Sequence, residues 1–428
     1  MKRNVAIVLG MVTWAATGCL ELNTKNSSSG DGGNGGTAGH GGSGGTTAGG
    51  GGTIEAFCGN GLIEANEECD DGNPNNDDGC DSNCIRERSS ALFIGKPGMT
   101  GFMDGVGSDA LLTANSILAI WGDTLYLGDN STVRTANVIT AEVKTIAGAA
   151  GTAGFADAAY GFDARFNNVN AFATDGTTVW VADSGNHLLR GISINAPYTT
   201  TTVAGAAGMA GTVDGPGPQA RFDTIRGLTY LNGILYIVDA TAVVLRSYNP
   251  VTNEVKTLAG VAYAVGNQDG IGSTARFSSP RYLTSDGSNR IFIAETQGSI
   301  IRQYNVNTGE VKTLAGTGLC GHVDGPAPAA RINTPRGIAY DGQRIYWTEN
   351  EAHLIRQQTL VTGEVTTLSG LLPPCAIDCT CGTAMGGGYV EGLLSSAQWK
   401  GPYDIVYHPP SKTFYVSDGG NYVVRRIR

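Results

Sequence analysis

The 428-residue sequence is poor in charge and has little long apolar sequence. Its 28 Lys and Arg are outnumbered by 38 Asp and Glu, which gives a formal net charge of −10, and nothing basic is arranged to follow a phosphate backbone. We therefore exclude nucleic acid as a partner. The apolar run from Val5 to about Ala16 is too short to cross a bilayer core of roughly 30 Å.

Signals of catalysis are also scarce. The chain has 5 His, and no set of three recurs at equivalent positions to hold a zinc ion. No G-x-S-x-G motif stands at a strand-to-helix elbow, and no helix is evident to carry one. These absences favour a binding protein over an enzyme. The alternative is an exported propeller enzyme, similar to the amidating lyases or the lactonase-like hydrolases, with a metal ion in its central channel.

Glycine, by contrast, is abundant, and it closes six short apolar runs spaced by about 55 residues. Each copy holds several short β-branched runs without a helical period, which is typical of four-stranded units arranged around an axis. The sequence therefore predicts an all-β fold, a six-bladed β-propeller over residues 88–428. The closing glycines are Gly95, Gly148, Gly205, Gly260, Gly316 and Gly370.

Each copy also carries one acidic residue at the end of its second strand and one arginine in its third strand. The chain stops at Arg428, in the third strand of the last copy, whereas Leu92–Ile94 is an outer strand with no blade before it. We expect this N-terminal strand to close the last blade, which would remove exposed sheet edges. The acids are Asp129, Asp183, Asp239, Glu295, Glu349 and Asp418, and the arginines are Arg134, Arg190, Arg246, Arg302, Arg356 and Arg425.

The repeats resemble the NHL family, whose signature is an apolar strand, an acid, a turn with Asn and His, and Ile or Leu before Arg. The segments VWVADSGNHLLR (Val179 to Arg190) and IYWTENEAHLIR (Ile345 to Arg356) match it closely. The resemblance covers essentially everything after Arg88. It implies a propeller that binds a protein, peptide or glycan through its loop face.

The start of the first strand of each blade should face the mouth of the central channel. Three successive blades place arginine there, and we propose an arc for a carboxylate, sulfate or acidic glycan, because guanidinium groups pair bidentately with such anions. The alternative is that each of these arginines pairs with the acid of a blade. The aligned residues are Ser116, Asn170, Arg226, Arg281, Arg336 and Tyr403, and the candidate ligand-binding residues are the last five.

A second repeating set, Arg165, Arg221, Arg276 and Arg331, follows Ala in each copy. It recurs together with Asp214, Asp269 and Asp324 in Asp-Gly turns. We expect these arginines to be structural and to hold the loop to the blade.

The first 57 residues predict export and attachment. Lys2 and Arg3 precede the apolar run, so residues 1–18 are a predicted signal peptide. Ala16 to Cys19 resembles a bacterial lipobox, which implies lipidation of Cys19; the alternative is ordinary secretion. Residues 19–57, rich in Gly and Ser, form a predicted disordered tether. Leu20 favours the outer membrane of the cell envelope, with the lipid as the only membrane contact.

Residues 58–87 resemble the short myxobacterial-type cysteine-rich repeat, which in turn is similar to Lin-12/Notch repeats. A module this small, outside the cytoplasm, is expected to depend on two disulfides among Cys58, Cys69, Cys80 and Cys84, with three possible connectivities. A dense set of oxygen donors could hold calcium, or could be a solvated acidic turn; zinc is less favoured. The donors are Asp70, Asp71, Asn73, Asp77 and Asp78.

The remaining cysteines lie in the loops that enter blades five and six. We expect at least one disulfide between these loops, and no cofactor in the propeller itself. The four residues are Cys320, Cys375, Cys379 and Cys381.

Overall fold

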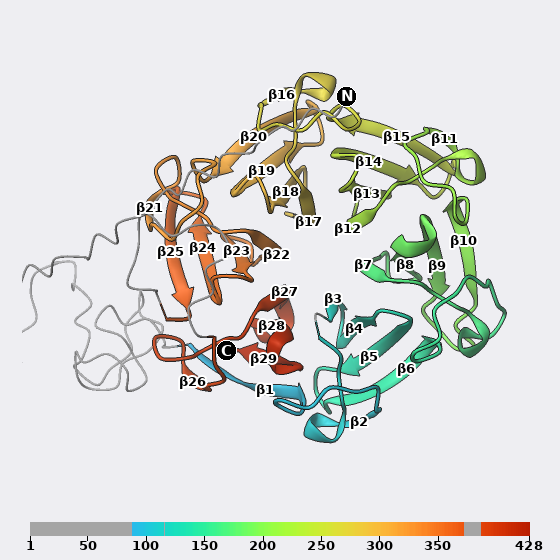
Figure 1. Cartoon of the computed structure of the whole chain (residues 1–428), viewed down its shortest axis with the longest axis horizontal. Coiled ribbons are helices and arrows are strands. Elements are labelled where there is room, and N and C mark those ends of the chain that lie inside the picture. Colours follow the sequence, from blue (N-terminus) through green and yellow to red (C-terminus); the bar gives the residue numbers. More distant parts are fainter. Residues whose placement is uncertain (1–87, 115, 372–386) are drawn as a thin grey trace, which may run out of the picture. The chain divides into compact units, whose positions relative to one another are not determined.

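The computed structural model describes residues 88–114, 116–371 and 387–428. The described residues form six antiparallel sheets arranged in a ring, with one strand of each sheet nearest the central axis (Figure 1). The predicted six-bladed, all-β propeller is confirmed. The predictions for residues 1–87, including Cys19, the tether and the cysteine-rich module, concern residues outside the described ranges.

The four main strands of each blade follow the chain from the axis outward. The inner strands are β3 (Ile117–Trp121), β7 (Val169–Thr174), β12 (Ile225–Leu231), β17 (Pro280–Ser285), β22 (Pro335–Tyr340) and β27 (Pro402–His408). The second strands are β4 (Thr124–Asp129), β8 (Thr178–Asp183), β13 (Ile234–Asp239), β18 (Arg290–Glu295), β23 (Arg344–Glu349) and β28 (Thr413–Asp418). The third strands are β5 (Thr132–Asn137), β9 (Leu188–Ser193), β14 (Val244–Asn249), β19 (Ile300–Asn305), β24 (Leu354–Thr359) and β29 (Val423–Ile427). The outer strands are β6 (Glu142–Gly148), β10 (Thr200–Gly205), β15 (Glu254–Ala259), β20 (Glu310–Ala315), β25 (Glu364–Ser369) and β1 (Ser89–Gly95).

Five blades carry a further two-residue strand that the repeat pattern did not predict. It forms where the loop from the previous blade passes the outer strand, and a short 3-10 helix follows it in three of the five blades. The extra strands are β2 (Gly105–Val106), β11 (Gly215–Pro216), β16 (Gly270–Ile271), β21 (Gly325–Pro326) and β26 (Gly392–Leu393). The described 3-10 helices are η1 (Gly107–Asp109), η2 (Gly161–Asp163), η3 (Ser184–Asn186), η4 (Gly217–Gln219), η5 (Gly272–Thr274), η6 (Pro409–Ser411) and η7 (Gly419–Asn421).

The N-terminal strand closes the ring, as the sequence predicted. β1 pairs antiparallel with β29, with Leu92 opposite Arg425 and Ile94 opposite Val424. Ile94 is fully buried and belongs to an apolar cluster that joins blades six and one. The last blade is therefore built from both ends of the propeller.

The apolar core lies between neighbouring blades. The Ala-Arg-Phe triplet explains part of it, because the Ala and the Phe of each triplet are buried while the Arg between them is only half-buried, as in Ala220 and Phe222. These side chains pack between the sheets of adjacent blades.

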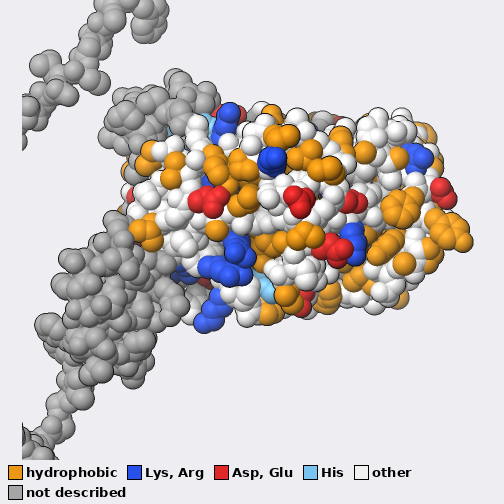
Figure 2. Space-filling model, turned by 90° about the horizontal axis from the view of Figure 1, so that it is seen from below, with side chains coloured by type: hydrophobic (Ala, Val, Ile, Leu, Met, Phe, Trp, Pro, Cys, Tyr) orange, Lys and Arg blue, Asp and Glu red, His pale blue; other side chains and the backbone are white. Residues whose placement is uncertain are grey.

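Figure 2 shows one side of the molecule, where apolar side chains lie among charges of both signs. No helix in the described part of the chain is long and apolar enough to span a membrane.

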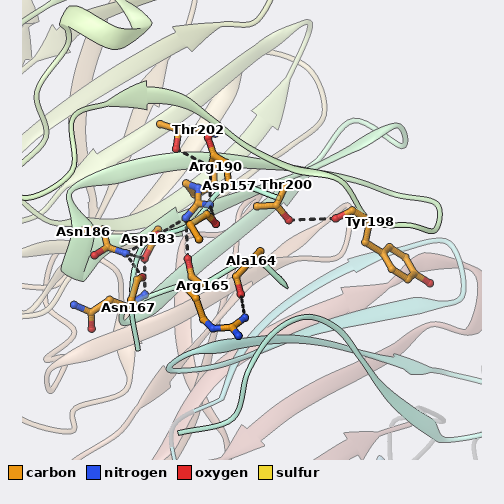
Figure 3. A network of polar contacts seen from close by, with 12 residues as sticks. Asp157, Ala164, Arg165, Asn167, Asp183, Asn186, Arg190, Tyr198, Thr200 and Thr202 are labelled. Carbon is orange, nitrogen blue, oxygen red and sulfur yellow. Dashed lines mark hydrogen bonds and ion pairs between the residues drawn. The ribbon is translucent and has the colours of Figure 1, made fainter. Parts of the chain in front are cut away.

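One buried arginine in the third strand of each blade ties the layers together. In blade two, Arg190 donates to Asp183 at the end of β8 and to Asp157 in the incoming loop, both at 2.7 Å (Figure 3). Asp157 in turn accepts from the backbone N–H of Thr202 on β10, at 2.9 Å. The guanidinium group also lies 5.0 Å from the ring of Phe166. One side chain thus joins two strands, a loop and the core.

The same arrangement recurs around the ring, and the six arginines are at most 1% exposed. In blade six the aligned loop acid, Glu391, accepts from the hydroxyl of Tyr389, and Arg425 donates instead to the hydroxyl of Ser90 on the N-terminal strand. The ion pairs of the other blades are Arg134 with Asp129 and Asp104, Arg246 with Asp239 and Asp214, Arg302 with Glu295 and Asp269, and Arg356 with Glu349 and Asp324.

These pairs correct two sequence-based expectations. The loop acids Asp214, Asp269 and Asp324 do bind loop to blade, but through the third-strand arginines and not through Arg221 and its equivalents. Arg221 instead donates to the carbonyl oxygens of Pro218 and Ala220 in its own loop. The acids that end the second strands are likewise paired with the third strands, so none of them pairs with Arg226, Arg281 or Arg336.

Candidate functional site

A β-bulge opens the inner strands at the channel mouth. In blade three, Ile225 lies opposite Asp239 and Gly227 lies opposite Val238, so Arg226 between them has no partner in the ladder. Blades four and five repeat the irregularity at Arg281 and Arg336. A bulge redirects the extra side chain away from the sheet, and bulges are frequent beside binding sites. The three arginines that the sequence aligned are therefore the bulged residues of their inner strands.

Glycine and proline explain the local backbone of this mouth. A Cβ on Gly227 would lie 2.4 Å from the carbonyl oxygen of Arg281, so only glycine lets the inner strands of blades three and four approach this closely. Pro280 and Pro335 begin β17 and β22, where the missing N–H costs no ladder hydrogen bond. Each proline directly precedes an arginine of the mouth.

The three arginines of the mouth are near one another. Burial lowers the pKa of Arg281, and the positive charges of Arg336 and Arg226 lower it further. Within the described residues, none of the three makes an ion pair with an acid. The Nε atoms of Arg281 and Arg336 are buried without a hydrogen bond. This is an unneutralised cationic site, and an anion would relieve its repulsion.

The two other candidate residues border the same mouth. Asn170 is the bulged residue of β7 and is 5% exposed, and its Nδ2 has no hydrogen-bond partner in the described residues. Tyr403, on β27, is buried with its ring 4.9 Å from the guanidinium carbon of Arg336. A buried amide N–H₂ without a partner is a free donor that a ligand oxygen could satisfy.

The histidines of the two NHL-like turns have structural positions, and most cysteines of the propeller loops lie outside the described residues. His187 and His353 adopt positive φ angles at the turns between second and third strands, and the ring of His187 contacts the backbone carbonyl of Asp223. Cys320 is in the loop that enters blade five, whereas Cys375, Cys379 and Cys381 lie in the segment outside the described residues. Their disulfide pairing therefore stays a prediction.

Sequence reasoning missed a cavity of about 260 Å³ in the channel. It is lined by the inner strands beyond the mouth and contains the buried carboxyl of Asp404. Burial raises the pKa of Asp404 to about 7, although the backbone N–H groups of Leu118 and Ile405 donate to it. An alignment of the repeats could have identified Asp404. At the position directly after the mouth residue, the other five blades have no acid, and only blade six has one, Asp404. The other five residues are Ile117, Ala171, Gly227, Tyr282 and Gly337.

The alternative of a metal enzyme needs several donors that converge in the channel. In the described part of the chain, no group of three or more His, Cys, Asp or Glu residues is placed to hold a metal ion. Asp404 is the only carboxylate among the described residues that line the cavity.

The ring of six blades defines this chain as a six-bladed β-propeller, and three arginines stand at its mouth. No protein-family model matches the chain. It is 26% identical over 306 residues to SUPPRESSOR OF QUENCHING 1, a chloroplastic protein of Arabidopsis thaliana. This match covers 66% of this chain and 29% of that protein. It is 24% identical over 310 residues to NHL repeat-containing protein 2 of Homo sapiens, covering 64% of this chain and 43% of that one. The chain thus spans less than half the length of both relatives.

Solved structures agree on the fold. An auxiliary nutrient binding protein from Bacteroides thetaiotaomicron superposes with a TM-score of 0.60 at 17% identity, covering 81% of this chain and 78% of that one. A protein of unknown function from the same organism gives a TM-score of 0.58 at 16% identity, covering 79% and 75%. Together with the relatives, these structures support the NHL-type propeller that the repeats predict.

Proposed function

We propose that this protein is a non-enzymatic binding protein of the cell envelope that captures a ligand bearing carboxylate or sulfate groups at the channel mouth. The single observation that carries this proposal is the group of three half-buried arginines, Arg226, Arg281 and Arg336, which have no acidic partner among the described residues. Charge of one sign, held on rigid strands and left unpaired, is costly unless a ligand neutralises it.

The geometry also favours the class of ligand. Guanidinium groups present planar pairs of donors that match carboxylate and sulfate groups. Asn170 adds an amide donor, and Tyr403 adds an aromatic face beside Arg336. An acidic glycan or an acidic peptide would satisfy all of these groups. A nutrient-binding role, which one structurally similar protein from Bacteroides thetaiotaomicron is reported to have, agrees with such a function.

Calorimetric titration with trigalacturonate tests the proposal, with the fully methyl-esterified trimer as the uncharged control. We expect the acid to bind and the ester to bind at least about tenfold more weakly, since each charge-assisted pair contributes roughly 1.5–3 kcal/mol. Arg281→Ala and Arg336→Ala should weaken binding of the acid. Arg221→Ala removes the same charge from a loop arginine and should leave binding intact. Equal affinity for acid and ester, or for Arg281→Ala and the wild type, would contradict the proposal.

We further propose that the propeller is attached to the outer membrane through a lipid on Cys19, and that the cysteine-rich module holds two disulfides and a calcium ion. Radiolabelled palmitate should be incorporated into the wild type and not into Cys19→Ala. Titration of the full chain with CaCl₂ should show one site that Asp77→Asn weakens. Unlabelled wild-type protein would overturn the anchor, and an absence of calcium binding would overturn the metal site.

A further inference from the structure

The channel holds a second site on the other side of the arginine mouth. Its cavity is lined by the residues that follow the mouth position in each inner strand, and the lining continues to the far ends of those strands, at Trp121, Thr174, Tyr340 and Tyr407. None of the three mouth arginines is among the lining residues.

An aromatic pair stands between the two sites. Tyr282 lines the cavity and packs edge-on against Tyr403, with ring centroids 6.0 Å apart and planes at 81°. Tyr403 in turn lies against Arg336. Both tyrosines are buried, so this end of the cavity is closed by packed rings.

Asp404 is the only charged residue among the described residues that line the cavity. Its Oδ2 accepts from the N–H of Leu118 at 2.8 Å, and its Oδ1 accepts from the N–H of Ile405 at 2.9 Å. Each carboxylate oxygen has a second lone pair. Asp404 is only 5% exposed, and it makes no ion pair in the described structure. A buried carboxylate of this kind lacks a cation.

The opposite end of the cavity is aromatic. Trp121, Tyr230, Tyr340 and Tyr407 line it at or next to the ends of four inner strands, and Trp121 is 49% exposed. Aromatic faces attract organic cations. Asp404 and Tyr407 are three residues apart on β27, so the two residues are on the order of 10 Å apart along the strand and their side chains point to opposite faces of it. The ring of Tyr407 packs against Phe414, and the ring of Tyr340 packs against Phe292.

The inner strands supply further acceptors. Each of them is the last strand of its sheet on the channel side, so one edge of its backbone has no neighbouring strand. Carbonyl groups on such an edge need donors from water or a ligand. A primary ammonium group brings three donors and no acceptor, which suits a site composed of a carboxylate and carbonyl oxygens.

We propose that this cavity binds an aliphatic diamine or polyamine, with one ammonium group at Asp404, the carbon chain along the apolar inner strands and a second ammonium group at the far end, beside the half-exposed ring of Trp121. Neutral polyols match the size of the cavity but leave the carboxylate unpaired. The net charge of −10 also attracts cations to the protein. None of the mouth arginines lines this site, and Tyr282 lies between Asp404 and Arg336.

Calorimetric titration of the full chain at 0.15 M NaCl tests the site with 1,5-diaminopentane, spermidine and the matched neutral 1,5-pentanediol. We expect one equivalent of each amine to bind, and the diol to bind at least about tenfold more weakly. Asp404→Asn should weaken amine binding at least about tenfold, whereas Glu142→Gln, which removes an exposed charge, should not change it. Arg281→Gln should also leave it intact, and this separates the site from the proposed anion function.

Trp121→Ala gives a test that does not disturb the buried carboxyl. Because Trp121 is half exposed, this variant should fold, and it should bind the diamines about two- to fivefold more weakly. Equal affinity for the diol and the diamine would overturn the proposal. So would binding of CaCl₂ without binding of amines, or amine binding that is unchanged in both Asp404→Asn and Trp121→Ala.

Discussion

Two sets of arginines in one propeller show how position decides what a residue does. The third-strand arginines are fully buried, and Arg190 is held by Asp183 on one side and Asp157 on the other. The mouth arginines, such as Arg281, are half-buried and face other arginines instead of acids. The charge of each third-strand arginine is neutralised by acids of its own blade, whereas the charge of the mouth arginines is not, so it can attract an anionic ligand.

The backbone accounts for this difference. A third-strand arginine keeps a partner on the second strand, where Arg246 is opposite Ile237 and two residues from the level of Asp239, although the pairing with the outer strand shifts register beside it. A mouth arginine lies in a bulge, outside the ladder. The bulge places the side chain at the channel mouth, away from the acids that end the second strands.

The largest expected effect separates the two sets by stability. Arg190→Met should lower the free energy of unfolding by about 3–5 kcal/mol, because Asp183 is left buried without its cation. Arg281→Met should change it by less than about 1 kcal/mol. Urea unfolding of both variants checks this comparison. Equal destabilisation would show that the mouth arginines are structural as well.

The sixth third-strand arginine extends the comparison to the closing strand, since Arg425 bonds to Ser90 of β1. Ile94→Asp would bury a charge in that strand and should cost at least about 3 kcal/mol. Lys96→Asp, two residues further and exposed, serves as the control. Unfolding of Ile94→Asp at the wild-type urea concentration would mean that β1 does not close the ring in solution.

The free energy of unfolding measured across a pH series tests the buried carboxyl of Asp404, which has no ion-pair partner in the described residues. The pKa of Asp404 is about 7 in the folded protein, above the unfolded value near 4, so between these values the folded state binds the extra proton. Without amine, stability should therefore fall as pH rises, by about 2–3 kcal/mol from pH 5 to pH 7 relative to Asp404→Asn. The slope should end above pH 7. Parallel pH profiles for the wild type and Asp404→Asn would contradict this assignment.

The smallest effect concerns salt. Repulsion among Arg226, Arg281 and Arg336 is screened by ions, so raising NaCl from 0.05 to about 0.5 M should stabilise the wild type slightly more than Arg281→Gln, by less than roughly 1 kcal/mol. Thermal unfolding of both proteins across this range measures the difference. A larger gain for Arg281→Gln would mean that the arginine is paired.

Much of the fold could be predicted because the repeat is regular. The spacing of the closing glycines indicated the blades, and the strand around Ile94 indicated the closure of the ring. The two-residue strands such as β2 were missed, because two residues carry no alternation of apolar and polar side chains.

The partners of the charges were harder to predict. Asp214 and Arg246 are 32 residues apart and meet only because the incoming loop folds across the blade, so the repeat pattern did not indicate that they are partners. Asp404 was missed for the opposite reason. It occurs in one blade only, and its neighbours Leu118 and Tyr282 come from two other blades, so a comparison of repeats did not identify it.

Sulfate stabilisation tests the central claim, that the mouth arginines are an open anion site, without a choice of natural ligand. Thermal unfolding would be followed in sodium sulfate and in sodium chloride at equal ionic strength, for the wild type and for the triple variant R226Q/R281Q/R336Q. Sulfate stabilises many proteins by exclusion from their surfaces, and the variant accounts for that general effect. A bound anion adds stability in proportion to its occupancy, so sulfate should raise the midpoint of the wild type clearly more than that of the variant. Identical sulfate shifts in the two proteins would contradict the claim.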